Sequence, residues 1–338
     1  MTSRELVYST LEFRNTQNRA PRELWSLKWA EMFQKEDYDR IVNKYIWDID
    51  TPKVIYKECS TVESGDPYVV GEYVDVWGCK FKSVHAGIIG EVKEPIVTDD
   101  EWNDISNVVF PENLLSFDIE QVNEECAKSD KFMLSDFYAR PFERLQFIRG
   151  TENLYMDLMF MPQGLVDFIE KMHQFYCRVF EKWAMTDVDA LWFMDDWGSQ
   201  KSLLINPKLW REIFKPMYKD YVNIAHSHGK KIFMHSDGYI LDIIPDLIEI
   251  GVDAVNSQIF CMGVENLSQF KGKITFWGEI CRQHIIPNGS PDDVKTAVKS
   301  VYDHLWDNGG CIAQCEYGPA ANPNNVDLIY ETWNKLTE

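Results

Sequence analysis

Short apolar segments alternate with longer amphipathic segments from about residue 131 to the C-terminal end of the chain. A short apolar run predicts a buried strand, whereas apolar residues spaced three and four positions apart predict a helix. The predicted strands are residues 131–135, 190–194, 231–234, 253–256, 274–277 and 311–314. The predicted helices are residues 163–183, 207–228, 241–250, 291–306 and 325–336. This alternation is typical of a parallel sheet covered by helices.

The N-terminal third of the chain has a less regular pattern. Residues 18–24 are expected to form the first strand of a barrel, residues 68–84 a twisted hairpin and residues 87–92 another short strand. Neither a linker nor an internal repeat divides the chain. We therefore expect one (β/α)8 TIM barrel domain over residues 1–338, with residues 68–92 as an elaboration that covers its mouth.

Polar residues gather where the predicted strands end. In an α/β barrel, ligands bind and chemistry takes place at the C-terminal ends of the strands, so these residues are candidates for function. The strand-end residues are Asp136, Asp195, Asp196, His235, Asp237, Asn256, Gln258, Glu279, Cys315 and Glu316. This set of imidazole, carboxylate and thiol groups is the ligand chemistry of a transition-metal site, most commonly zinc.

Residues i and i+2 of a strand point to the same face, so His235 and Asp237 can both reach one ion. Cys315 stands at a strand end and is the candidate thiolate ligand, and Glu279 is a further candidate. Each residue also has a structural interpretation. His235 could be a hydrogen-bonded core residue, Cys315 a packed apolar thiol, and the pair Asp195-Asp196 a cap for the turn that follows.

The charge of the chain excludes several classes of partner. A formal net charge of -20 argues against binding to nucleic acid, anionic membranes or polyanionic substrates. No apolar stretch approaches the roughly 20 residues of a membrane span, and the eight cysteines lack paired spacing. We therefore expect a cytoplasmic protein. Glycine-rich phosphate loops and a GxSxG nucleophile elbow are absent from the sequence, which disfavours nucleotide cofactors and serine hydrolysis.

Several short motifs together resemble one enzyme family. They are Asp195-Asp196-Trp197-Gly198-Ser199-Gln200, Asn206-Pro207, Lys215-Pro216, His228-Gly229-Lys230, His235-Ser236-Asp237-Gly238, Trp277-Gly278-Glu279-Ile280 and Glu316-Tyr317-Gly318-Pro319. With these motifs the chain resembles the uroporphyrinogen decarboxylase superfamily over nearly its whole length. The resemblance implies a (β/α)8 barrel with its site at the C-terminal rim.

Two activities of that superfamily compete. The true decarboxylases carry an Arg-Gln-Ala-Gly-Arg-Tyr motif that binds the carboxylates of the tetrapyrrole, and here the corresponding segment begins Asn18-Arg19-Ala20-Pro21. The other branch, the zinc- and corrinoid-dependent methyltransferases, is similar to this chain at His235 and Cys315, but Asp237 stands where that branch has a cysteine. A carboxylate makes the metal harder and favours an oxygen or nitrogen methyl donor over a thiolate.

The resemblance therefore implies a zinc-dependent methyltransferase that acts on a small O- or N-methylated substrate, such as a methoxylated aromatic. Zinc is expected on His235, Asp237, Cys315 and Glu279, with a corrinoid supplied by a partner protein, because no histidine follows an aspartate in the corrinoid-binding spacing. The residues expected to transfer protons are Asp195, Asp196 and Glu316. The residues expected to contact substrate are Trp25, Trp77, Trp197 and Asn256.

Two other functions remain open from the sequence. One is decarboxylation, either of a small acid without metal or of uroporphyrinogen, and the other is ligand binding by a barrel that has lost its chemistry. We expect a homodimer by analogy with similar barrels.

Overall fold

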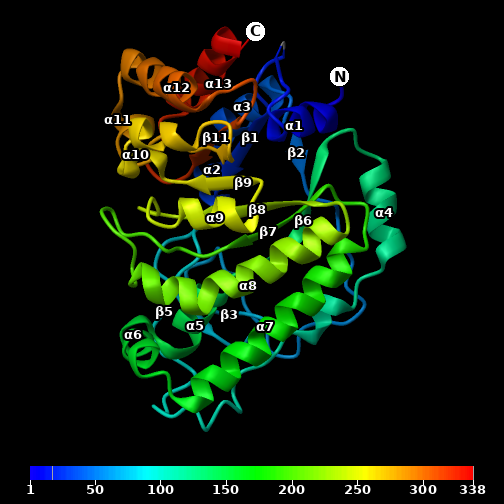
Figure 1. Cartoon of the computed structure of the whole chain (residues 1–338), viewed down its shortest axis with the longest axis vertical. Coiled ribbons are helices and arrows are strands. Elements are labelled where there is room, and N and C mark those ends of the chain that lie inside the picture. Colours follow the sequence, from blue (N-terminus) through cyan, green and yellow to red (C-terminus); the bar gives the residue numbers. More distant parts are fainter. Residues whose placement is uncertain (17, 338) are drawn as a thin grey trace.

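In the computed structural model, which describes residues 1–16 and 18–337, the largest sheet has eight parallel strands that curve into a barrel (Figure 1). The order of its strands is β1 (Arg22–Ser26), β11 (Cys311–Tyr317), β10 (Thr275–Trp277), β9 (Ala254–Ser257), β8 (Lys231–Ser236), β7 (Ala190–Met194), β6 (Phe132–Ala139) and β2 (Ile49–Asp50). The order follows the sequence around the barrel, apart from the first strand, which pairs with the last. The predicted TIM barrel is confirmed.

Helices surround the sheet and close its N-terminal end. The helices are α1 (Ser3–Leu11), α2 (Lys28–Phe33), α3 (Lys35–Lys44), α4 (Ile119–Ala127), α5 (Pro141–Arg149), α6 (Thr151–Phe160), α7 (Gln163–Ala184), α8 (Pro207–Ser227), α9 (Ile244–Ile250), α10 (Ile259–Met262), α11 (Ile285–Asn288), α12 (Pro291–Leu305) and α13 (Pro323–Thr337). Helices α7 and α8 lie side by side along one flank (Figure 1). Among the described residues, none of the helices has the length and apolar character needed to cross a bilayer.

Two separate cores stabilise the barrel because successive side chains of each strand point to opposite faces. The interior core includes Phe132, Phe233, Trp277 and Ile312, together with residues of α1. The larger core lies between the strands and the surrounding helices. On β11, therefore, Ile312 points into the barrel, whereas its neighbours Cys311 and Ala313 belong to the outer core.

The two ends of the sheet meet without a ladder of strand hydrogen bonds between β1 and β2. Asp48 joins them instead: its amide donates to the carbonyl of Arg22 at 2.9 Å, and its carboxylate accepts from the amide of Arg22 at 2.7 Å. The same carboxylate accepts hydrogen bonds from Arg19 and from Ser3 of α1. This buried aspartate closes the barrel.

The predicted elaboration over residues 68–92 is an antiparallel sheet of β3 (Gly71–Val74), β4 (Lys80–Ser83) and β5 (Glu91–Val92). It lies beside the start of α2, where the amide of Trp29 donates to the carbonyl of Gly87 at 3.0 Å. The close approach requires glycine, because a Cβ on Gly87 would lie 2.6 Å from the Cα of Trp29. Short 3-10 helices occur at Glu112–Leu115 (η1) and Val264–Phe270 (η2).

Candidate metal centre at the rim of the barrel

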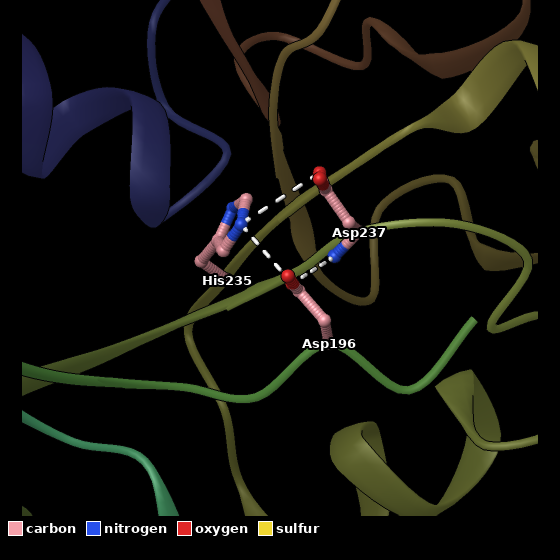
Figure 2. Close-up of side chains that lie close together, drawn as sticks. All are labelled: Asp196, His235 and Asp237. Carbon is pink, nitrogen blue, oxygen red and sulfur yellow. Dashed lines mark hydrogen bonds and ion pairs between the residues drawn. The ribbon is translucent and has the colours of Figure 1, made fainter. Parts of the chain in front are cut away.

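Three side chains converge where β7 and β8 end. Asp196 follows β7, His235 is the penultimate residue of β8, and Asp237 comes directly after that strand. Nε2 of His235 lies 3.5 Å from Oδ1 of Asp196 and 3.7 Å from Oδ1 of Asp237, as Figure 2 shows. One ligand atom of each residue lies within 4.8 Å of those of the other two. The geometry is that of a group able to hold a metal ion.

The register of the sheet explains why these residues meet. Met194 of β7 is paired with His235 of β8, so both strands end at the same level. The amide of Asp237 donates to Oδ1 of Asp196 at 2.9 Å, which fixes the second carboxylate beside the first (Figure 2). His235 and Asp237 share a face because they are two positions apart, which is the side-chain period of a strand.

His235 is oriented by Asn256 of the next strand. Oδ1 of Asn256 lies 2.6 Å from Nδ1 of His235, while the amide group of Asn256 donates to the carbonyl of Trp277. That second contact identifies Oδ1 as the acceptor, so Nδ1 carries the proton and Nε2 faces the carboxylates. Burial lowers the pKa of His235, but the hydrogen bond with Asp196 and the charge of Asp237 outweigh it and raise the pKa to about 9.

Arg282 connects the other acidic residues of the rim. Its guanidinium contacts Oδ2 of Asp237, lies 2.5 Å from Oε2 of Glu316 and lies 3.5 Å from Oε1 of Glu279. Glu279 is only 2% exposed, and neither of its carboxyl oxygens has a hydrogen-bond partner among the described residues. Burial raises the pKa of Glu279 to about 8, although the charge of Arg282 opposes this. The carboxyl groups of Asp196, Asp237, Glu279 and Glu316 therefore share this rim with the side chains of Arg282 and His235.

The structure does not bring Cys315 to the group that was expected to share its metal ion. Cys315 belongs to the outer core and contacts α13, where its Sγ lies 3.5 Å from the hydroxyl of Tyr330. Its neighbour Glu316 is the residue that reaches Arg282 at the rim. Burial raises the pKa of the Cys315 thiol to about 12, so it packs as a neutral group. Of the four expected ligands, His235, Asp237, Cys315 and Glu279, the structure brings His235 and Asp237 into one group, and the third member of that group is Asp196.

The two neighbouring aspartates have different surroundings. Asp195 is fully buried and accepts hydrogen bonds from the amides of Phe142 at 3.0 Å and Glu143 at 2.8 Å, in the first turn of α5. The hydroxyl of Tyr218 also donates to it at 2.5 Å. Asp195 therefore holds α5 and α8 against β7. Among the predicted acid–base residues, Asp196 is the one whose side chain forms an ion pair with the imidazole of His235 in the described part of the chain.

The predicted substrate-binding residues fall in different places. Trp25 lies inside the barrel, with its ring centroid 4.9 Å from that of His235, and forms an apolar surface below the three candidate ligands. Trp197 is fully buried and stacks on Phe142 at 4.1 Å, which makes it a core residue. Trp77 lines a separate cavity, and Asn256 contacts His235 rather than open space.

Sequence reasoning missed two arginines, Arg282 and Arg140. Arg282 lies in the loop after β10, three positions after Glu279, and a basic residue so soon after a buried strand-end carboxylate was the available signal. Arg140 begins the turn into α5, a helix that the pattern did not predict, and Nη2 lies 2.9 Å from Sδ of Met194 on β7.

The chain matches the model of the uroporphyrinogen decarboxylase (URO-D) family over residues 73–336. No curated protein matches it. Among solved structures, a methyltransferase from Methanosarcina mazei is similar with a TM-score of 0.68 and 11% identity, covering 100% of both chains. A 3-keto-D-glucoside 4-epimerase from E. coli, in its apo form, has a TM-score of 0.40 and 10% identity over 64% of this chain and 84% of its own. From the family match over most of its length, this chain belongs to the uroporphyrinogen decarboxylase family.

Proposed function

We propose that this protein is a zinc-dependent methyltransferase that moves a methyl group between a small O- or N-methylated molecule and a corrinoid carried by a partner protein. The observation that supports it is the convergence of Asp196, His235 and Asp237 at the rim of the barrel. The family match and the fold shared with the methyltransferase of Methanosarcina mazei are compatible with this proposal.

The three residues fit a zinc ion in chemistry and in orientation. Zinc accepts imidazole nitrogen and carboxylate oxygen as ligands, and a catalytic zinc keeps a position open for substrate. His235 already presents Nε2 to the carboxylates, because Asn256 holds its other nitrogen. When bound, zinc would act as a Lewis acid that stabilises negative charge on the atom losing its methyl group.

Contacts within the protein orient the proposed zinc ligands and leave them accessible. Arg282 binds Oδ2 of Asp237, which leaves Oδ1 directed toward His235. Asp196 has a side chain that is 39% exposed, so the group is accessible from the mouth of the barrel. A ligand set with two carboxylates and no thiolate is harder than one with cysteines, which favours an oxygen or nitrogen methyl donor.

A second candidate is metal-free decarboxylation of a small acid. The observation in its favour is that the charges can balance without an ion, because His235, with its pKa raised to about 9, is cationic at neutral pH between Asp196 and Asp237. A cationic imidazole and Arg282 would then bind the carboxylate of the substrate.

Metal binding by the purified protein tests the leading proposal before any substrate is known. We expect about one zinc ion per chain, and at least about tenfold weaker zinc binding in Asp196→Asn, His235→Ala and Asp237→Asn. Cys315→Ser is the matched control, because its thiol faces Tyr330, and it should bind zinc as the wild type does. Unchanged zinc binding in all three ligand variants would contradict the proposed site.

The reaction is tested with free cob(I)alamin as the acceptor and a series of small methyl ethers and methylamines as donors. Formation of methylcobalamin, followed by its absorbance, is expected with the wild type and not with His235→Ala. Release of CO2 from a small acid by metal-free protein would instead support decarboxylation.

A further inference from the structure

Helix α6 has two apolar sides, and the rest of the chain buries only one of them. Leu154 and Leu158 pack into the outer core and are 0% and 1% exposed. On the other side, Met156, Met159 and Phe160 have the i, i+3, i+4 spacing of one helix face and are 53%, 75% and 74% exposed. A surface helix normally turns polar residues to the solvent, and clustered exposed apolar side chains mark an interaction site.

A groove of about 380 Å³ lies beside this exposed face. Met156 and Phe160 belong both to the exposed face and to the lining of the groove, and Pro162, just after α6, also lines it. Methionine side chains adapt to apolar partners of different shape because they are unbranched and flexible. The face and the groove form one apolar surface, which we call the α6 surface and define by Met156, Met159, Phe160 and Pro162.

The charge beside the α6 surface is negative. The groove is lined by three carboxylates, those of Asp100, Glu101 and Asp157, and by one cation, Arg149. Arg149 is only 2% exposed and is already paired with Asp157 and with Asp100, both at 2.6 Å. Three acidic groups and one basic group leave a formal net charge of −2. A ligand that covers this surface should therefore carry positive charge beside its apolar groups.

These charges distinguish between possible occupants of the α6 surface. In a symmetric dimer the same surface of both chains would meet, so the carboxylates of one copy would face those of the other. An anionic membrane would be repelled in the same way by a chain with a net charge of -20. A helix with lysine or arginine beside an apolar stripe fits both the apolar side chains and the carboxylates.

We propose that the α6 surface binds a basic amphipathic helix of a partner protein, with its apolar stripe on Met159 and Phe160 and its cationic side chains beside Asp100 and Glu101. This inference goes beyond the proposed function and does not depend on it, because these residues lie outside the candidate metal centre. Helix α6 lies between the end of β6 and the start of α7, so it belongs to the C-terminal face of the barrel. The partner would dock on that face.

Fluorescence anisotropy with three labelled peptides tests the proposal on the purified full-length chain. Each peptide has about 14 residues, enough for about four helical turns. The first carries leucines on one helix face and lysines on the other, the second has glutamates in place of the lysines, and the third has serines in place of the leucines. The first should bind at least about tenfold more tightly than the other two, because only it matches both the apolar side chains and the carboxylates.

Variants of the protein locate the binding. Met159→Ser and Phe160→Ser should each weaken binding of the leucine–lysine peptide at least about tenfold, and Glu101→Gln about two- to fivefold. All three residues are exposed, so these substitutions should leave the fold intact. Phe33→Ser on α2 and Asp292→Asn on α12 are the matched controls, because Phe33 is 55% exposed and the side chain of Asp292 is 92% exposed. Both should bind the peptide as the wild type does.

Equal affinity of the wild type for the three peptides would overturn the proposal without any variant. A preference that persists in Phe160→Ser would place the binding elsewhere on this acidic chain and would overturn it as well. Light scattering on the same samples tests for a second copy of the chain. A wild-type dimer that dissociates in Phe160→Ser would show that another copy covers the α6 surface, which would also overturn the proposal.

Discussion

At the scale of single residues, the neighbours Asp195 and Asp196 have different roles: we expect Asp195 to stabilise the fold and Asp196 to bind the metal ion. Asp195→Ala removes the acceptor for two backbone amides of α5 and for the hydroxyl of Tyr218. Leaving these donors unpaired in the core should lower the free energy of unfolding by about 3 kcal/mol. Asp196→Asn retains an oxygen for the amide of Asp237, so we expect nearly normal stability and weakened zinc binding. Urea unfolding and zinc titration measure the two effects.

The outcome that would contradict this division is a stable Asp195→Ala protein that fails to bind zinc. In that case Asp195, and not only Asp196, would contribute to the metal centre. The variant Asp195→Asn should fall between wild type and Asp195→Ala in stability, because the amides of Phe142 and Glu143 donate to different oxygens of Asp195 and asparagine keeps only one acceptor oxygen.

The convergence of His235 and Asp237 could be predicted from the sequence, because the two-residue period of a strand fixes their common face. The position of Cys315 could not. Both faces of β11 are buried, so the hydrophobic pattern does not reveal which residues point into the barrel. Cys315 and Glu316 must point to opposite sides, and only the packing of Cys315 against Tyr330 identifies the outer one.

At the scale of secondary-structure elements, a buried aspartate of α9 joins that helix to α8. Asp246 lies 2.9 Å from Nε of Arg211 and 2.7 Å from Nζ of Lys215, and it is 6% exposed. Burial alone would raise the pKa of Asp246, but its hydrogen bonds and ion pairs with these residues outweigh that effect and lower it. At neutral pH, Asp246→Asn should lower the free energy of unfolding by about 1 to 2 kcal/mol.

The pH dependence of this loss follows from the direction of the shift. A lowered pKa stabilises the folded protein above the unfolded value of about 3.9, and the stabilisation disappears as the pH falls through the folded value. The difference between wild type and Asp246→Asn should therefore shrink below about pH 4. Asp292→Asn is the control, because Asp292 has a side chain that is 92% exposed and forms a surface ion pair with Lys295. A difference that stays constant down to acidic pH would contradict the role of the ion pairs.

Elements with a clear hydrophobic periodicity were predicted well. Elements that form only through contacts with distant parts of the chain were not. The strands Ala190–Met194 and Thr275–Trp277 lie within the predicted ranges, since the strand–helix alternation of the C-terminal part marks them clearly. The first strand was expected at residues 18–24 but is Arg22–Ser26, and Ile49–Asp50 was missed. A strand of two residues has no periodicity to detect, because it forms only through pairing with β6.

At the scale of the whole molecule, closure of the barrel depends on side-chain hydrogen bonds as well as on the sheet. Seven strand pairings connect the eight strands in a parallel order from β1 to β2, and the two terminal strands are joined through Asp48. In this order β6 separates β7 from the seam on one side, and β9, β10 and β11 separate β8 from β1 on the other, so the candidate metal centre lies on the continuous part of the sheet. A rigid support of this kind suits residues that must keep their spacing around an ion.

Substitution of Asp48 tests the importance of this closure. Asp48 is fully buried, and its carboxylate accepts from Arg19 at 2.6 Å and from Ser3 at 2.6 Å. In Asp48→Asn the guanidinium of Arg19, whose side chain is only 17% exposed, loses its counterion. Breaking a buried ion pair from one side should lower the free energy of unfolding by about 3 kcal/mol, measured by urea titration.

The matched control for Asp48→Asn is Asp39→Asn, because Asp39 forms an exposed ion pair with Lys35 at 2.8 Å and its loss should change stability by less than about 0.5 kcal/mol. Hydrogen exchange adds a spatial readout: Asp48→Asn should increase exchange in β1 and β2 first, since these strands flank the seam, and leave β8 protected. Zinc binding should then persist at temperatures below the transition. Equal stability of the two variants, or equal loss of protection in β8 and β2, would show that the barrel closes without Asp48.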